Sequence, residues 1–312
     1  MEIFYSKENL TPLEKSILTV GSFDGLHRGH QEILKTVVKK SKTYKIPSVL
    51  VTFNPHPRMI IKDNFKKLSL IRSLDQKLKI IKDIGIDIVY IISFSQKFSN
   101  TTALDFMSKI IVPNFGPKAI VTGSNHYFGR NREGSPSFLK NYGQDKQIEI
   151  IVIKPVMDDK SQISSSNIRS LIRLGNISKA NIQLNTPFTI SGTVVKGSGR
   201  GASLKFQTAN IKPKENNQLF PKNGVYLVLG RIVGLNTYGM CNLGVRPTFG
   251  ESKLVMEVHL FHEKELNLYG ERIEIEFLER IRDERKFPSS KELIKQLKID
   301  KLICLGLLNK YQ

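Results

Sequence analysis

The order of apolar segments along the chain constrains its fold more than any other feature of the sequence. Up to about residue 175, short apolar segments alternate with amphipathic segments of helical period; from Phe188 onward, apolar segments follow one another with only Gly-, Pro- and Asn-rich turns between them. The first pattern predicts parallel strands joined by helices, and the second predicts a small antiparallel barrel. We therefore expect two domains, residues 1–185 and 186–312, which suits a chain of 312 residues.

Changes of pattern set the bounds of the expected elements. In the first domain the expected strands are Ser16–Gly21, Pro47–Phe53, Asp87–Phe94, Ala119–Gly123 and Ile148–Val156. The expected helices there are Gln31–Lys42, Leu74–Ile84, Thr102–Val112 and Ser166–Leu174. In the second domain the expected strands are Phe188–Val195, Gly224–Gly230, Tyr238–Leu243, Leu254–Phe261 and Arg272–Phe277. A closing helix begins at Ser290, with Ser289 or Ser290 as its cap.

The charge of the chain narrows the choice of partners. Lys and Arg number 48 against 28 Asp and Glu, which gives a formal net charge of +20 at pH 7. Such a charge suits nucleic acid or a polyphosphate substrate. The lysines are scattered along the chain and Trp is absent, so we expect solvated helix faces and no nucleic-acid interface. A basic, non-enzymatic nucleic-acid-binding protein remains the remote alternative.

Targeting and redox features favour a cytoplasmic protein. No apolar run approaches the ~20 residues that cross a bilayer, and residues 1–8 lack the apolar core of a signal peptide. Cys241 and Cys304 are too few for a disulfide scaffold and lack a metal-ligand spacing. We expect no membrane partner, and a monomer or weak oligomer.

The segment Gly21–His30, Gly-Ser-Phe-Asp-Gly-Leu-His-Arg-Gly-His, follows the first expected strand and opens the first expected helix. Ligands of open parallel sheets bind at the carboxyl ends of the strands, where the N-terminus of the following helix offers N–H groups and positive potential to phosphate. His27 and His30 are three residues apart, so both rings project to one side and can stabilise charge on an α-phosphate. A metal site is the weaker alternative, because no third ligand lies nearby. The expected ATP- and phosphate-binding residues here are Gly21, Phe23, Asp24, Gly25 and Gly29.

A second anion-binding pattern opens the last expected helix of the first domain. Ser164, Ser165 and Ser166 lie at its start, and Arg169 lies about one turn inside. Hydroxyl groups at a helix start can cap the helix or donate to a β- or γ-phosphate, and a guanidinium offsets phosphate charge. Three serines alone indicate an ordinary cap. With the two histidines on the same sheet edge, phosphate binding is the favoured interpretation.

Gly21–His30 resembles the nucleotide-binding motif of the bacterial bifunctional riboflavin kinase/FMN adenylyltransferases, the FAD synthetases. The segments Thr52–Pro57, Gly123–Gly129 and Ile163–Arg169 resemble further motifs of that family in the same order. The resemblance implies an α/β nucleotidyltransferase-type, Rossmann-like parallel-sheet domain, followed by a small antiparallel riboflavin-kinase-like β-barrel domain with a C-terminal helix. It also implies flavin or nucleotide binding by Asn54, His56, Pro57, Asn125 and Arg132. For His56, a turn residue braced by two prolines is an equal alternative.

The second domain resembles the kinase module of the same family. Gly197, Gly199 and Gly201 form a Gly-rich turn that can present N–H groups to phosphate, although such hairpins without function are as common. By resemblance, Thr208 and Asn210 help to hold Mg-ATP, and their alternation on an extended segment lets both oxygens share one Mg²⁺.

Asn242–Phe249 and Met256–Leu260 extend the resemblance. It makes Glu257 the general base toward the ribityl hydroxyl and places Arg246 at the flavin or nucleotide. Without those flanking motifs, a solvated strand carboxylate would be the favoured interpretation of Glu257.

The resemblance implies two reactions. Riboflavin is phosphorylated by Mg-ATP to FMN and ADP, and AMP is then transferred from ATP to FMN, giving FAD and pyrophosphate. Several residues depart from the family pattern: Thr186, Ala202, Lys205 and Gln207 in the kinase module, and His126 for Phe and Ser166 for Thr in the first domain. The nearer alternative is therefore an FMN adenylyltransferase with a weakened or inactive kinase module.

Overall fold

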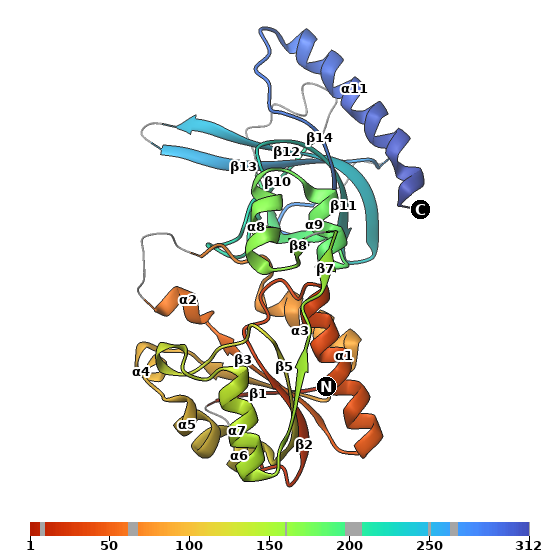
Figure 1. Cartoon of the computed structure of the whole chain (residues 1–312). Helices are drawn as coiled ribbons and strands as arrows, with labels where there is room; N and C mark the ends of the chain where they lie inside the picture. Colours follow the sequence, from red (N-terminus) through yellow and green to blue (C-terminus); the bar gives the residue numbers. More distant parts are fainter. Residues whose placement is uncertain are drawn as a thin grey trace. The chain divides into compact units, whose positions relative to one another are not determined.

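The computed structural model describes residues 1–6, 10–61, 68–159, 161–196, 208–248, 251–262 and 268–311. The chain divides into two compact units (Figure 1). The first unit is Met1–Leu68 with Arg72–Ser164, and the second is Ser69–Ile71 with Ser165–Gln312. The compact units thus divide between Ser164 and Ser165, whereas the division of the two activities after residue 185 remains a proposal.

A six-stranded sheet forms the centre of the first unit. Its strands are β1 (Glu2–Tyr5), β2 (Ser16–Val20), β3 (Ser48–Asn54), β4 (Ile88–Ser93), β5 (Pro117–Gly123) and β6 (Glu149–Ile153). They lie in the order β1-β4-β3-β2-β5-β6, and every neighbouring pair is parallel. The predicted parallel sheet is confirmed. The sequence pattern missed β1, whose four residues alternate weakly and are mostly exposed.

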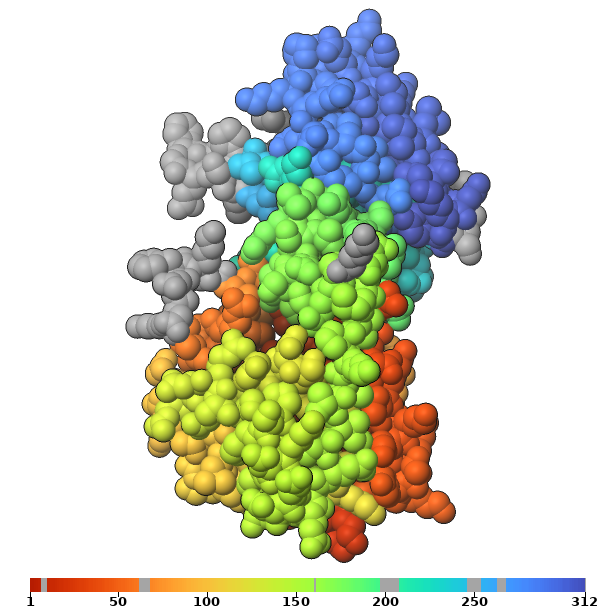
Figure 2. Space-filling model, viewed as in Figure 1, coloured from red at the N-terminus to blue at the C-terminus, as the bar shows by residue number. Residues whose placement is uncertain are grey.

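Helices cover both faces of this sheet. On one face lie α1 (Arg28–Tyr44) and α3 (Leu74–Ile84), whose apolar residues, such as Leu34 and Ile81, pack against the strands. On the other lie η1 (Phe106–Ile111), α6 (Val112–Phe115) and α7 (Pro136–Lys146). In Figure 2 the visible surface of the first unit is formed largely by the residues after β4, drawn in yellow and yellow-green. Because both faces are covered, ligands can reach the sheet only at its edges and strand ends.

The segment predicted as one helix, Thr102–Val112, folds as three consecutive pieces. These are α5 (Ala103–Asp105), the π-helical η1 and α6. Pro113 lacks the N–H group that would bond four residues back, and the π-helical turn lies directly before it, where such irregularities are expected. Short elements complete the unit: α2 (Pro57–Ile60), α4 (Gln96–Ser99), η2 (Arg130–Arg132), β7 (Met157–Asp158) and β8 (Ser161–Gln162).

The second unit begins with two helices and continues as a closed antiparallel barrel. The helices are α8 (Ser165–Arg173) and α9 (Ile177–Leu184). The strands are β9 (Phe188–Val195), β10 (Ala209–Pro213), β11 (Gly224–Ile232), β12 (Leu235–Thr248), β13 (Glu251–Leu260) and β14 (Arg272–Arg282). They close in the order β10-β13-β12-β11-β14-β9. The predicted barrel is confirmed, whereas α9 was not predicted; its Asn181 ties it to the barrel by bonding the backbone of Phe188 and Phe277.

The C-terminal helix α11 (Ser290–Leu307) packs on the outside of the barrel and is followed by the short turn η3 (Leu308–Lys310). Ser289 caps its first turn by accepting from the N–H of Glu292. Asp300, which is fully buried, accepts from both Nε and Nη2 of Arg282 on β14 and so anchors the helix. No helix among the described residues is both long and apolar enough to span a membrane.

Candidate active sites

The strand order of the first unit defines where a ligand can bind. From β2 the chain proceeds outward through β3 and β4, and then returns to place β5 on the other side of β2. The connections after β2 and after β5 therefore leave the sheet in opposite directions, which opens a crevice between their carboxyl ends. Gly21–His30 follows β2, and Asn125 and His126 follow β5, so the expected residues meet at this point of reversal.

The two histidines lie at the N-terminus of α1. His27 is the N-cap, and its Nδ1 accepts from the backbone N–H of His30 at 3.4 Å. Their rings stack with centroids 3.6 Å apart and an interplanar angle of 18°, so both lie on one side of the helix start. Because Nδ1 of His27 is an acceptor, its proton in the neutral ring belongs on Nε2, which can therefore act as a donor.

The turn before the helix is unusually constrained. Gly25 has φ +83°, and Phe23 and Leu26 both have φ +46°, in the left-handed region that side chains rarely adopt. A Cβ on Gly21 would lie 2.8 Å from the ring of Phe23, which itself contacts His30 edge-on at 5.2 Å. Gly21 and Gly25 are therefore required by the shape of the turn.

Two buried cations, which the sequence reasoning missed, support this turn from α3 and the residues before it. Arg72 donates Nε to the carbonyl of Gly25 at 3.1 Å, and Lys77 donates Nζ to the carbonyl of Ser22 at 3.1 Å. Both residues are buried, as is Asp24. A signal for Lys77 was present, because it lies one turn before Ile81 on the apolar face of the predicted helix 74–84.

Burial determines the charge of the histidines. Desolvation lowers the pKa of His27 from 6.5 to about 4 and that of His126 likewise to about 4. The pKa of His30 lies well below 6.5, first because of burial and then because of the charges of His27, Lys77 and His126. The three rings are therefore neutral at pH 7, and each neutral ring carries one N–H group that can donate.

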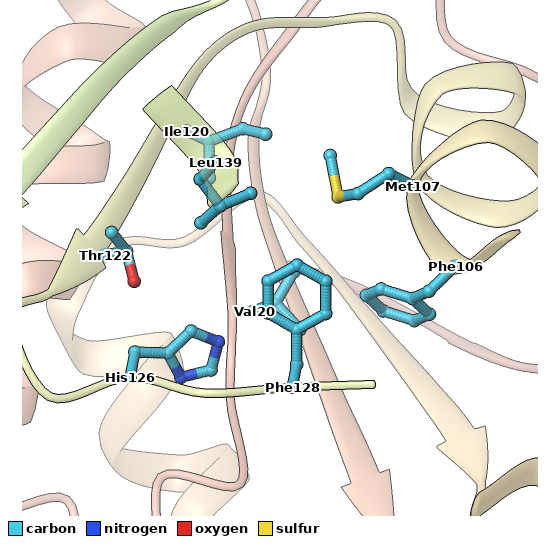
Figure 3. Close-up of a pocket in the computed structure, with 8 residues that line it drawn as sticks. All are labelled: Val20, Phe106, Met107, Ile120, Thr122, His126, Phe128 and Leu139. Carbon is cyan, nitrogen blue, oxygen red and sulfur yellow. The ribbon is translucent and has the colours of Figure 1, made fainter. Parts of the chain in front are cut away.

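His126 lies beside a small cavity at the end of β5. The cavity has a volume of about 10 Å³, so it holds one water at most. Figure 3 shows His126 and Thr122 on one side of this space and Met107 and Phe106 on the other. The ring of His126 also stacks on Phe128 at 5.8 Å. An aromatic ring at position 126 therefore has a packing role, whichever ring is present.

The other predicted residues of the first unit have local partners. His56 caps α2 by accepting from the N–H of Arg58, and Pro57 is the first residue of that helix. Asn54 ends β3 and is exposed. The Asn125 amide donates to Gln162 at 3.3 Å, and the Arg132 guanidinium lies 4.8 Å from the ring of Tyr127.

The serine segment spans the division between the units. Ser164 ends the first unit, and Ser165 and Ser166 begin α8 in the second. Arg169 is buried in the second unit and donates Nε to the carbonyl of Ser69 at 2.9 Å. Arg169 thereby holds the segment Ser69–Ile71, which belongs to the same unit.

In the barrel, three polar residues form a row across adjacent strands. Glu257 on β13 is paired with Asn210 on β10 and with Asn242 on β12. Directly paired residues of antiparallel strands project to the same face. Their neighbours Cys241 and Val258 are buried in the barrel, so the row Asn210–Glu257–Asn242 faces outward. Asn242 begins the resembling segment Asn242–Phe249, but the resemblance gives it no role in the site.

The remaining predicted residues are only partly described. Thr208 lies two residues before Asn210, at the entrance to β10, and is half-buried. Gly197, Gly199 and Gly201 lie outside the described residues, as do Ala202, Lys205 and Gln207. For Arg246 the backbone alone is described, as part of β12 paired with Lys253.

Comparison with known proteins identifies the family. Residues 10–167 match the family model for FAD synthetase, and residues 184–307 match that for riboflavin kinase. The chain belongs to the bifunctional riboflavin kinase/FMN adenylyltransferase family.

Relatives in this bifunctional riboflavin kinase/FMN adenylyltransferase family align over nearly the full chain. The protein of that name from Buchnera aphidicola subsp. Acyrthosiphon pisum is 34% identical over 308 residues, 97% of each chain. That of Escherichia coli K12 is 32% identical, covering 97% of this chain and 96% of its own. A crystal structure named as a macrolide-efflux protein from Streptococcus pneumoniae has a TM-score of 0.89 and 30% identity, covering 97% of this chain and 99% of its own.

The buried histidines predict how stability depends on pH. Between pH 6.5 and 4 the unfolded chain binds a proton at His126 that the folded chain does not, so stability falls as the pH drops through this window and levels off below it. Replacing His126 with Phe removes that contribution. Between pH 7 and 4.5, the free energy of unfolding should therefore fall by roughly 2 kcal/mol less in His126→Phe than in the wild type. Urea unfolding at the two pH values measures this difference.

The matched control is His262→Phe, because His262 is exposed. An equal loss of pH dependence in both variants would show that the effect does not depend on position 126. An unchanged pH dependence in His126→Phe would contradict the burial of a neutral imidazole at this position.

Proposed function

We infer that the chain makes FAD from riboflavin in two ATP-dependent steps, one in each domain. The observation that carries the adenylyl step is the stacked pair His27 and His30 at the N-terminus of α1, at the point where the strand order reverses. The family match over both halves of the chain supports the pairing of the two activities.

In the adenylyl step an oxygen of the FMN phosphate attacks the α-phosphorus of ATP. The new P–O bond forms as the bond from the α-phosphorus to the bridging oxygen breaks, and pyrophosphate leaves. The attacking phosphate is already anionic at neutral pH, so no protein base is required. His27 and His30 donate N–H bonds to the oxygens on which charge accumulates, while the N–H groups of α1 face the polyphosphate.

The other predicted residues of the first domain complete this proposal. Ser164, Ser165, Ser166 and Arg169 are assigned to the phosphates of ATP, and Asn125, Asn54 and Arg132 to the flavin or nucleotide. Pro57 and His56 are assigned to the shape of the loop after β3, since His56 caps α2. The reaction sequence thus requires ATP twice, once in each domain.

In the kinase step the oxygen of the ribityl hydroxyl group attacks the γ-phosphorus of a first ATP. Glu257 takes the proton of this hydroxyl group, and ADP leaves. Its place in the row Asn210–Glu257–Asn242 supports this role, because the carboxylate projects to the outer face beside two amide groups. The Gly-rich turn with Gly197, Gly199 and Gly201 is assigned to the phosphates, and Arg246 to the flavin or nucleotide.

The residues beside Glu257 fit Mg²⁺. Thr208 and Asn210 offer a hydroxyl and an amide oxygen, which are the hard oxygen donors that Mg²⁺ accepts alongside water and phosphate. Mg²⁺ bound there would neutralise charge on the phosphates.

We also propose that the enzyme works in the cytoplasm as a monomer or weak oligomer. The nearer alternative, an adenylyltransferase with an inactive kinase domain, is distinguished by the two experiments below.

Replacing His30 with Ala should stop FAD synthesis without affecting FMN synthesis. We expect the rate of FAD formation from FMN to fall by at least about 10²-fold, because a donor to the developing charge is lost. FMN formation from riboflavin should stay within twofold of the wild type. Chromatography of the flavins measures both, with His262→Ala as control. Surviving FAD output would refute the role of His30.

Replacing Glu257 with Gln should have the converse effect. We expect FMN formation from riboflavin to fall by roughly 10²–10⁴-fold, because the amide cannot accept the hydroxyl proton. FAD formation from supplied FMN should not change. Glu271→Gln, at an exposed position of the same domain, is the matched control. A wild-type protein with no kinase activity to lose would instead establish the single-activity alternative.

A further inference from the structure

Lys77 is a buried cation that the two-step chemistry above does not use. Its side chain lies on the buried side of α3 with Gln76 and Ile81, and only 8% of the residue is exposed. Burying an ammonium group costs free energy, and lysine is rarely buried without a paired charge or a function. An apolar residue would satisfy the packing of α3 at this position.

The Lys77 ammonium lies beneath the turn that leads into the two histidines. It donates to the carbonyl of Ser22 at 3.1 Å, and the buried Asp24 carboxylate interacts with its charge. Arg72 makes the corresponding contact three residues on, at the carbonyl of Gly25. Two cations therefore hold both ends of the same short turn.

This turn needs such support. Phe23 and Leu26 have φ of +46°, a conformation that persists only when the surrounding structure imposes it. The turn sets the position of the His27 cap and of the Phe23 ring, and that ring contacts His30. A shift of the Ser22 carbonyl would therefore move the groups that face the α-phosphate.

The charge of Lys77 also reaches His30. The charged and titratable groups that face His30 are His27 at the helix cap, Lys77 from α3 and His126 from the loop after β5. When the rings of His27 and His126 are neutral, Lys77 is the positively charged member of these three groups. It opposes protonation of His30 and adds to the positive potential at the N-terminus of α1.

We propose that Lys77 is a positioning residue for adenylyl transfer, which holds the turn after β2 and thereby keeps His27 and His30 in place. This role deepens the proposed FMN adenylyltransferase activity and rests on it. Lys77 would orient the two histidines from α3 without touching the reacting atoms.

The test compares Lys77→Met with Lys82→Met, an exposed lysine on the same helix. We expect Lys77→Met to lower kcat for FAD formation from FMN by on the order of 10²-fold, as misplaced catalytic groups do, with riboflavin phosphorylation within twofold of the wild type. In ¹⁵N NMR titrations of the imidazoles, the pKa of His30 should rise toward 6.5 in Lys77→Met. Lys82→Met should change neither quantity.

The titration separates positioning from a merely structural role when the other rings are followed too. Loss of the Lys77 charge should raise the pKa of His30 alone, whereas a loosened fold that lets water reach the rings would raise those of His27 and His126 as well, because burial lowers both. Wild-type kcat with an unmoved His30 titration in Lys77→Met would overturn the proposal. If Lys77→Met does not fold, Lys77→Gln keeps a hydrogen-bond donor for the Ser22 carbonyl and removes the charge; a raised pKa of His30 alone in that variant supports the proposal, and a wild-type His30 titration overturns it. If the wild type makes no FAD at all, the adenylyltransferase assignment fails, whereas the shift of the His30 titration still tests the coupling to Lys77.

Discussion

The parallel pairing of β2 with both β3 and β5 is the constraint on which the first domain depends. After β2 the chain continues to β3 and β4 on one side of this strand, and it later returns to form β5 on the other side. The crevice between the carboxyl ends of β2 and β5 is the consequence, and it is where His27, His30 and His126 come together. The helix N-terminus, the neutral rings and the buried cations beneath them all act at this one place.

The barrel imposes an equally simple constraint on the second domain. Because β13 pairs with β10 on one side and β12 on the other, Glu257 acquires two polar neighbours from distant parts of the chain. The side chains that alternate with this row, such as Cys241 and Val258, fill the core. One strand thus contributes both to the packing of the barrel and to the polar face that we assign to phosphoryl transfer.

The fold class and many bounds were predictable from the sequence because local signals coincide with the elements. The helix Leu74–Ile84 was predicted with the bounds observed, since Ser73 with Gln76 forms a capping box and Gly85 ends it with φ +95°. The strand Phe188–Val195 likewise matches. By contrast, α9 and β1 are short and depend on tertiary contacts. The roles of Arg72 and Lys77 arise only in the folded chain, because the carbonyl groups that they contact lie 47 and 55 residues earlier. The pairing of Glu257 with Asn242 also required the barrel register, which no spacing in the sequence encodes.

The most direct test of the central claim is a chromatographic assay of the purified wild-type protein with Mg-ATP, supplied with riboflavin in one reaction and with FMN in another. Two active sites on one chain predict FAD in both reactions, with FMN as the intermediate in the first. FAD from the FMN reaction alone would contradict the kinase assignment and leave the barrel as a flavin-binding platform. FMN from riboflavin with FAD in neither reaction would contradict the adenylyltransferase assignment, and no flavin product in either reaction would contradict the assignment of both sites.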